Sequence, residues 1–199
     1  MELLTLYKNT VDNKERDMKT REVTQISLMT SLIIALAFVP AIPVAIIPVP
    51  IVLQNFGIML AGLLLGSKKG TISVAILMAM VAVGLPVLTG GHGGVISFIG
   101  PSGGYLLSWL LMPSLMALFN RLCSTFVDKN SFWNVLISTI IVSILVSYAI
   151  TIVWISVQMH ITLQQSLLAN MVFIPGDVIK AIIAAFIAQR LLPIINKNA

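Results

Sequence analysis

The chain has 199 residues, of which 58% are hydrophobic and 10% are charged, and its mean hydropathy is +1.01. A soluble domain is about half apolar and about a quarter charged, so this composition excludes a water-soluble fold and indicates one integral membrane domain. The net charge of +5 does not indicate a nucleic-acid-binding protein, because the basic residues lie at the ends of apolar runs, where they set membrane topology.

The first segment, residues 1–23, predicts a cytoplasmic N-terminal extension, because it is polar and carries both signs of charge. No clear signal-peptide cleavage site follows the first apolar run. Six apolar runs then predict transmembrane helices, since a span needs roughly 20 apolar residues. We expect an all-α, six-helix membrane domain over residues 24–192 and a cytoplasmic tail over 193–199. The six expected spans cover about 24–41, 52–66, 71–88, 104–123, 132–158 and 166–192.

The basic residues predict the orientation of these spans. They precede the first span, follow the sixth, and lie between the second and third and between the fourth and fifth. The other three connections contain no Lys or Arg. Because Lys and Arg are enriched on the cytoplasmic side, we expect both termini to be cytoplasmic. The residues are Lys8, Lys14, Arg16, Lys19, Arg21, Lys68, Lys69, Arg121, Lys129, Arg190 and Lys197.

The three connections on the expected outer face have distinctive compositions. The first, "PAIPVAIIPVPIVLQN", is rich in proline, the second, "TGGHGGVISFIGPSGG", is rich in glycine, and the third, "QMHITLQQSL", is polar. Non-helical backbone near a membrane is tolerated where protein buries it or where it lines a cavity. The pattern therefore predicts a binding site that opens outward.

Asp177 and Lys180, in "FIPGDVIKAIIAAF", are the only Asp, Glu, Lys or Arg residues well inside an expected span. A charge at a helix centre costs about 2.5–3.5 kcal/mol, and a spacing of three places both residues on one helix face. We favour a ligand-binding pair over a pair that only fixes helix packing. Pro175 and Gly176 precede it, either as a kink that frees a carbonyl towards the site or as an ordinary packing kink.

Polar residues near the outer ends of other spans are further candidates. For Gln54 we favour contact with a polar ligand group over an interhelical hydrogen bond, and for the neighbouring Asn55 we favour the reverse. Gly91 and Gly93 expose backbone N–H groups in the glycine-rich connection, around His92, which is weaker evidence by itself.

Two hydroxyl residues and two alanines complete the candidates. Ser102 and Tyr105, in "IGPSGGYLLSW", offer hydroxyls to a ligand, and Tyr105 also offers an apolar face. Ala37 and Ala41 form a small-xxx-small pair on the expected first span, a spacing that allows a partner helix to approach closely.

Four segments, in this order, resemble the signatures of the BioY family, the biotin-specific S components of energy-coupling factor transporters. They are "PVPIVLQNFGIMLAGLLLGSKKG", "GLPVLTGGHGG", "IGPSGGYLL" and "FIPGDVIKA". The resemblance covers about residues 24–192. It implies a six-helix S-component fold in the cytoplasmic membrane of a prokaryote, with a pocket near the outer face. The long charged N-terminus and His92 in the glycine-rich loop are less typical of the family.

The resemblance also implies a ligand and partners. Biotin would be transported and not held as a cofactor, and the partners would be a transmembrane coupling (T) subunit, docked on the first span, and two ATP-binding-cassette ATPases. The chain has no Walker motif, so these partners would hydrolyse ATP. Asp177 would accept an N–H of the biotin ureido ring, Lys180 would donate to its carbonyl or lie beside it, and the carboxylate would point outward. The reverse pose pairs Lys180 with the carboxylate and ranks lower, because it places Asp177 near a second anion.

Three alternatives remain open at this level. An S component for another vitamin, such as riboflavin or thiamine, would favour more aromatic stacking than a 7% aromatic content suggests. A stand-alone secondary transporter would normally show two repeated halves and more ionisable residues. An intramembrane enzyme would need a nucleophile with a base, or a metal cluster, inside the spans, and we expect neither.

Overall fold

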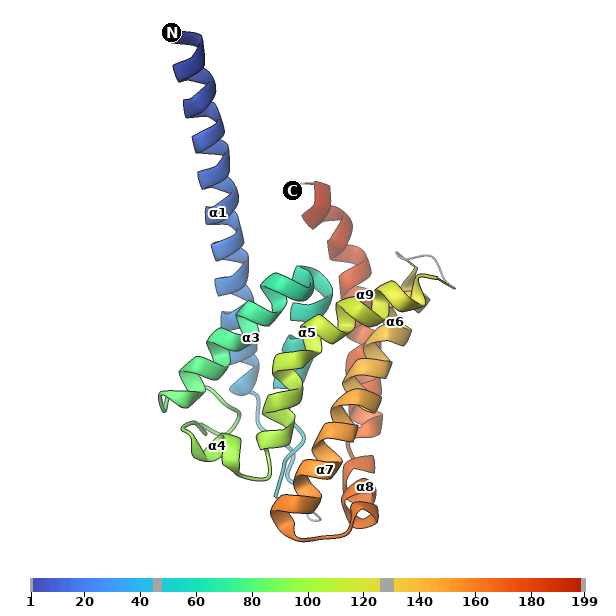
Figure 1. Cartoon of the computed structure of the whole chain (residues 1–199). Coiled ribbons are helices and arrows are strands. Elements are labelled where there is room, and N and C mark those ends of the chain that lie inside the picture. Colours follow the sequence, from blue (N-terminus) through green and yellow to red (C-terminus); the bar gives the residue numbers. More distant parts are fainter. Residues whose placement is uncertain (1, 45–47, 126–130, 198–199) are drawn as a thin grey trace.

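The computed structural model describes residues 2–44, 48–125 and 131–197. Within these ranges every named element is a helix (Figure 1), and the only strand-like features are two isolated β-bridges. Residues 1 and 198–199 of the expected terminal segments lie outside the described ranges, as does Lys129 of the topology argument. The expected all-helical class is confirmed for the described chain.

Among the described residues, four helical stretches are long and apolar enough to cross a membrane, judged by length and composition. They are residues Gln54–Ala82, Gly103–Cys123, Phe132–Met159 and Ile174–Ile195. Two of them match the expected fourth and fifth spans to within one residue. These two comprise α5 (Gly103–Cys123) and the continuous run of α6 (Phe132–Ile140), η2 (Ile141–Val146, a π-helix) and α7 (Ser147–Met159).

The stretch from Gln54 to Ala82 changes direction at Gly66. It contains α2 (Gln54–Leu60), the π-helix η1 (Ala61–Leu65) and α3 (Gly66–Ala82). Gly66 has φ 73° and ψ −167°, a backbone conformation that glycine adopts readily. A Cβ on Gly70 would lie 2.6 Å from the carbonyl oxygen of Ala61, so α3 folds back against η1. The turn falls between the expected second and third spans.

Helix α1 (Glu2–Ala37) runs without a break from the expected extension into the expected first span. Figure 1 shows its first half standing clear of the other helices. The helix ends at Ala37 because Val39 precedes Pro40, and a residue before proline is disfavoured in helical conformation. Ala41 therefore lies outside the helix, and Ala37 is only 7% exposed. The expected Ala37–Ala41 pair on one helix face is wrong.

The expected sixth span is divided into two helices, α8 (Leu163–Met171) and α9 (Ile174–Lys197). Pro175 lies in the first turn of α9, where its missing N–H costs little, so it begins a helix and does not kink one. Asp177 consequently lies in the first turn of α9 and not in the middle of a long helix. The glycine-rich connection also contains a short helix, α4 (Ile96–Ile99).

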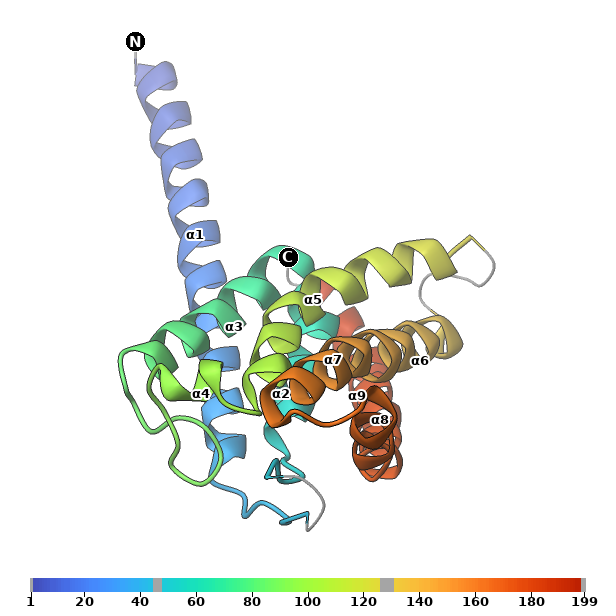
Figure 2. The ribbon, with the colours of Figure 1, turned by 60° about the horizontal axis from the view of Figure 1, so that its bottom comes forward.

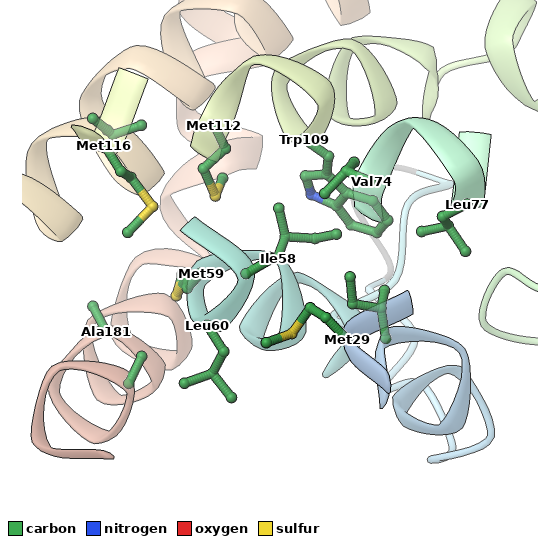
Figure 3. Close-up of a cluster of buried hydrophobic side chains, with 14 of the residues drawn as sticks. Met29, Ile58, Met59, Leu60, Val74, Leu77, Trp109, Met112, Met116 and Ala181 are labelled. Atoms are coloured by element: carbon green, nitrogen blue, oxygen red, sulfur yellow. The ribbon is translucent and has the colours of Figure 1, made fainter. Parts of the chain in front are cut away.

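The main apolar core lies where α1, α2, α3, α5 and α9 meet. Figure 2 shows α2 in the middle of this group. Figure 3 shows its buried side chains, among them Met29, Ile58, Met59, Met112 and Met116. Methionine is flexible and fills irregular gaps between helices. A smaller cluster around α7 and α8 includes Ile155, Ala169 and Phe173 and borders the site described below.

The closest approach of α5 and α7 requires glycine. A Cβ on Gly104 of α5 would lie 2.6 Å from Cβ of Trp154 and 3.2 Å from Cα of Thr151, both on α7. Trp154 also donates from Nε1 to the carbonyl oxygen of Gly100, at 2.9 Å. This contact sets the separation of the two helices that carry Tyr105 and Tyr148.

We expect Gly104→Ala to destabilise the protein, because the methyl group must push α5 and α7 apart. Overpacking of this kind costs about 1–3 kcal/mol. Thermal unfolding of the purified protein in detergent measures the loss. Gly176→Ala is the matched control, since a Cβ there meets no heavy atom within 4 Å. Equal unfolding temperatures for wild type and Gly104→Ala would contradict the close-packing argument.

Candidate functional site

A cavity of about 350 Å³ lies at the end of the molecule opposite the two termini. Its size falls within the range of about 300–1,000 Å³ that is usual for small-molecule sites. Its walls come from the proline-rich and glycine-rich connections and from the first turns of α2, α5 and α9. The lining side chains fall within residues 48–55, 88–109 and 173–180.

The carboxylate of Asp177 is the centre of the polar end of this cavity. It accepts hydrogen bonds from Asn55 Nδ2 at 2.8 Å and from Lys180 Nζ at 3.0 Å, both at Oδ1. Its Oδ2 accepts one from the hydroxyl of Tyr148 at 2.7 Å. A carboxylate offers about four acceptor positions, so Oδ2 retains one for a ligand. The N-terminal turn of α9 also favours a negative charge there.

Lys180 uses all three of its ammonium protons inside the protein. It donates to Asp177 Oδ1, to Asn55 Oδ1 at 2.9 Å and to the carbonyl oxygen of Val52 at 2.7 Å. Asp177 and Lys180 are 5% and 9% exposed, and a buried charge is tolerated when it is paired and hydrogen-bonded. The cluster is therefore neutral and already ordered, and a ligand acceptor at Lys180 must share or replace one of these bonds.

Tyr105 contributes to the cavity mainly through its ring. Its hydroxyl donates to Asn170 Oδ1 on α8, and the Asn170 amide donates to the carbonyl oxygen of Ser166 at 2.8 Å. The Tyr105 ring packs edge-on against Phe173, with 6.0 Å between ring centroids. The two aromatic rings give the cavity an apolar wall beside the charged cluster.

Gln54, expected to contact a ligand, fastens the glycine-rich connection to α2. Its Nε2 donates to the carbonyl oxygen of Val87 at 3.0 Å, and its Oε1 accepts from the backbone N–H and the hydroxyl of Thr89, both at 3.3 Å. The side chain lines the cavity, yet the residue is only 1% exposed. Its amide is thus largely committed to holding the loop.

The glycine-rich connection forms a compact loop that covers one side of the cavity. Gly90, Gly91 and Gly94 have φ values of 81°, 73° and 85°, a region that favours glycine. An antiparallel bridge joins Leu88 to His92. His92 lines the cavity, whereas the structure does not bring Gly91 into the lining.

Two more expected residues lie in the wall of the cavity. A side chain on Gly93 would collide with the carbonyl oxygen of Leu85, so only glycine fits at this point of the lining. Ser102 also lines the cavity and donates to the carbonyl oxygen of Ser97 at 3.3 Å.

Two residues of this network, Tyr148 and Asn170, are not among the residues expected from the sequence. Asn55 makes the interhelical hydrogen bond that the sequence favours for it, since it joins α2 to Asp177 and Lys180 of α9, and it also lines the cavity. Tyr148 lies on the fifth expected span, where buried polar residues recur every four positions at 143, 147 and 151. That spacing marks a polar helix face and could have directed attention to Tyr148 beside it.

The arrangement suits a ligand with a compact polar head and an apolar body. The polar end offers a carboxylate acceptor next to ammonium and amide donors, and the walls are aliphatic and aromatic. The described residues contain no group of three or more His, Cys, Asp and Glu that could hold a metal ion. The geometry therefore matches recognition of a small organic molecule.

Comparisons with known proteins point to one family. The family model described as BioY family matches residues 10–197. A biotin transporter BioY of Lactococcus lactis subsp. cremoris (strain MG1363) is 48% identical over 173 residues, covering 87% of this chain and 91% of that protein. A biotin transporter BioY of Rhizobium etli is 36% identical, with coverages of 88% and 95%.

A solved structure agrees with these relatives. The crystal structure of the S component for biotin from an ECF-type ABC transporter superposes with a TM-score of 0.82 at 46% identity, covering 88% of this chain and 92% of the other. The family match spans nearly the whole chain, and the fold, the identity and the coverage agree with it. The chain belongs to the BioY family.

Proposed function

We propose that this chain captures biotin at the outer face of the cytoplasmic membrane as the S component of an energy-coupling factor importer. The relatives named as biotin transporters and the S-component structure support this assignment. The observation that carries it is the neutral Asp177–Lys180–Asn55–Tyr148 cluster at one end of a cavity whose walls are mainly apolar. We infer that a T subunit and two ATP-binding-cassette ATPases complete the importer.

Biotin offers a donor and an acceptor that complement this cluster. The ureido ring carries two N–H donors and one carbonyl acceptor. One N–H is placed against the remaining acceptor position of Asp177. The carbonyl takes a proton of Lys180 in place of the carbonyl oxygen of Val52, or an amide proton of Asn55. The fused ring lies against Tyr105 and Phe173.

The biotin carboxylate then faces the other side of the cavity. There His92 and the backbone N–H of Gly93 offer donors to an anion, and the hydroxyl of Ser102 can do so by releasing its 3.3 Å bond to the carbonyl oxygen of Ser97. This pose leaves Lys180 paired with Asp177. The reverse pose would bring a second carboxylate close to Asp177, and like charges at short range disfavour each other.

We also propose six membrane spans with both termini inside. The turn at Gly66 divides the stretch from Gln54 to Ala82 into two spans, and the apolar second half of α1 supplies a further one. The distribution of Lys and Arg supports the orientation. On this topology the cavity opens outward, as capture from the medium requires.

We propose that the T subunit contacts a surface of α1 other than the expected pair of Ala37 and Ala41. Ser27, Ser31 and Ala35 are exposed and follow one another at intervals of four residues, so they form a narrow stripe of small side chains on one helix face. Ala37 is buried. Contact with a helix of the T subunit fits this stripe.

The function is tested by calorimetry of biotin binding to the purified chain and to Asp177→Asn and Lys180→Met. Each single variant leaves the other charge buried without its partner, which costs about 2–5 kcal/mol in comparable interfaces. We expect biotin affinity to fall at least about thirtyfold. Riboflavin and thiamine should give no heat of binding to the wild type, and tight binding of either instead of biotin would refute the assignment.

The double variant Asp177→Asn/Lys180→Met separates ligand recognition from folding. Replacing both members of a buried pair by neutral groups is often neutral for stability, so its unfolding temperature should recover relative to the single variants. Biotin binding should stay lost. A double variant that recovered both stability and wild-type affinity would give the pair a purely structural role.

Gln54→Leu should accelerate biotin dissociation by about tenfold or more, with little change in association. The substitution leaves buried groups of Val87 and Thr89 unpaired, at about 1–3 kcal/mol each, which loosens the loop that covers the ligand. Stopped-flow kinetics gives the rates, and hydrogen exchange of residues 87–94 should quicken in the unliganded protein. Unchanged exchange with weakened binding would instead make Gln54 a direct ligand contact.

Biotin methyl ester discriminates between the two poses. In the favoured pose esterification changes only the group at the mouth of the cavity, where contacts of a solvent-exposed charge are worth about 0–1 kcal/mol. Calorimetry should then show affinity within about tenfold of biotin, whereas methylation of the ureido nitrogens should abolish binding. Loss of ester binding in the wild type, together with equal binding of acid and ester by Lys180→Met, would establish the reverse pose.

A further inference from the structure

A second cavity, of about 370 Å³, lies at the opposite end of the helices from the biotin site. Figure 1 shows the start of α3 between α1 and the end of α9, on the side where both termini lie. The cavity is bounded by these three elements and by η1. Its lining consists of Arg21, Glu22, Gln25, Leu63, Leu64, Leu65, Gly66, Lys69, Leu192 and Ile195.

The polar part of this cavity consists of two half-buried cations, Arg21 and Lys69, together with the amide of Gln25 and the exposed side chain of Glu22. Arg21 donates from Nη2 to the carbonyl oxygen of Ile195 at 3.3 Å, and Lys69 donates from Nζ to Gln25 Oε1 at 2.8 Å. Neither pairs with an acidic side chain that the structure describes. A guanidinium has five N–H donors and an ammonium has three, so both cations keep donors for an anion.

The remaining walls are apolar and open on one side. Leu63, Leu64 and Leu65 belong to η1, and Leu192 belongs to α9. A Cβ on Gly66 would meet no heavy atom within 4 Å, so the chain leaves space at the turn. The cavity thus has cations at one end and leucine side chains at the other. This arrangement matches a phospholipid, whose charged headgroup is joined to apolar acyl chains.

The depth of the cavity in the bilayer also fits a lipid. Arg21 precedes the apolar half of α1, and Lys69 lies in the first turn of α3, directly after the change of direction at Gly66. On the proposed topology, on which this step rests, both cations lie at the level of the inner-leaflet headgroups. Basic pockets between transmembrane helices on the cytoplasmic side bind anionic headgroups.

We propose that this cavity binds an anionic phospholipid of the inner leaflet, with its phosphate between Arg21 and Lys69 and an acyl chain against the leucines of η1. A bound lipid would join α1, η1 and α9 at the end of the molecule remote from biotin. Free phosphate could satisfy the cations but not the leucines, so the occupant is the lipid and not the ion.

Native mass spectrometry and thermal unfolding of the purified full chain in neutral detergent test the proposal. Phosphatidylglycerol, phosphatidylcholine and inorganic phosphate are added separately to wild type, to Arg21→Gln/Lys69→Gln and to Lys68→Gln/Arg121→Gln. The last variant removes the same charge from exposed basic residues outside the cavity. It is therefore a matched control for non-specific attraction.

Phosphatidylglycerol should bind and stabilise the wild type, and its affinity should fall about thirtyfold in Arg21→Gln/Lys69→Gln. Each basic residue near an anionic headgroup contributes about fivefold. The control variant should change by less than about threefold. Equal losses in both variants, no loss in either, or equal stabilisation by phosphate or phosphatidylcholine would each overturn the proposal.

Calorimetry with biotin on the same samples keeps the two proposals separate. The cavity variant should bind biotin normally in detergent, because its substitutions lie at the opposite end of the molecule. Failure of biotin binding in wild type with normal lipid selectivity would refute only the proposed function. Normal biotin binding without lipid selectivity would refute only the lipid site.

Discussion

The buried ion pair of Asp177 and Lys180 is the interaction on which the site depends. Asp177 is 5% exposed and Lys180 is 9% exposed. At this burial either charge would be strongly destabilising without the other. Their partners come from three other parts of the chain, since Tyr148 lies on α7, Asn55 on α2 and Val52 in the proline-rich connection. Satisfying the pair therefore fixes the start of α9 against these segments, and the same contacts define one end of the cavity.

The break between α8 and α9 makes this pair possible. Because α9 begins at Ile174, Asp177 lies in its first turn, where the helix dipole favours a carboxylate. In a continuous helix Asp177 would lie at the middle of a span with no such support. The same break lets α8 turn Asn170 towards Tyr105. The two helices thus supply separate polar groups to neighbouring parts of the site.

Hydropathy predicted α5 and the α6–α7 run to within a residue, since turn-forming or charged residues bound both. It missed the break before Ile174, because Val172 and Phe173 are themselves apolar and the pattern continues across them. It extended the first span to Ala41, although Pro40 ends the helix earlier. The ionised pair was evident because charge is rare in an apolar span. The sequence does not show which of the two adjacent amides faces the pair. A shift of one residue around α2 decides whether that residue is Gln54 or Asn55.

The α2–η1 run and α9 border both cavities, and this arrangement links the two ends of the molecule. At the end remote from the termini Asn55 contacts Lys180, and at the opposite end η1 and Ile195 line the cationic cavity. The two cavities share no lining residue, so a substitution in one leaves the contacts of the other in place. Any coupling between a lipid and biotin would have to pass along these two shared elements. It would be reciprocal by thermodynamic necessity, so each ligand would change the affinity of the other by the same factor.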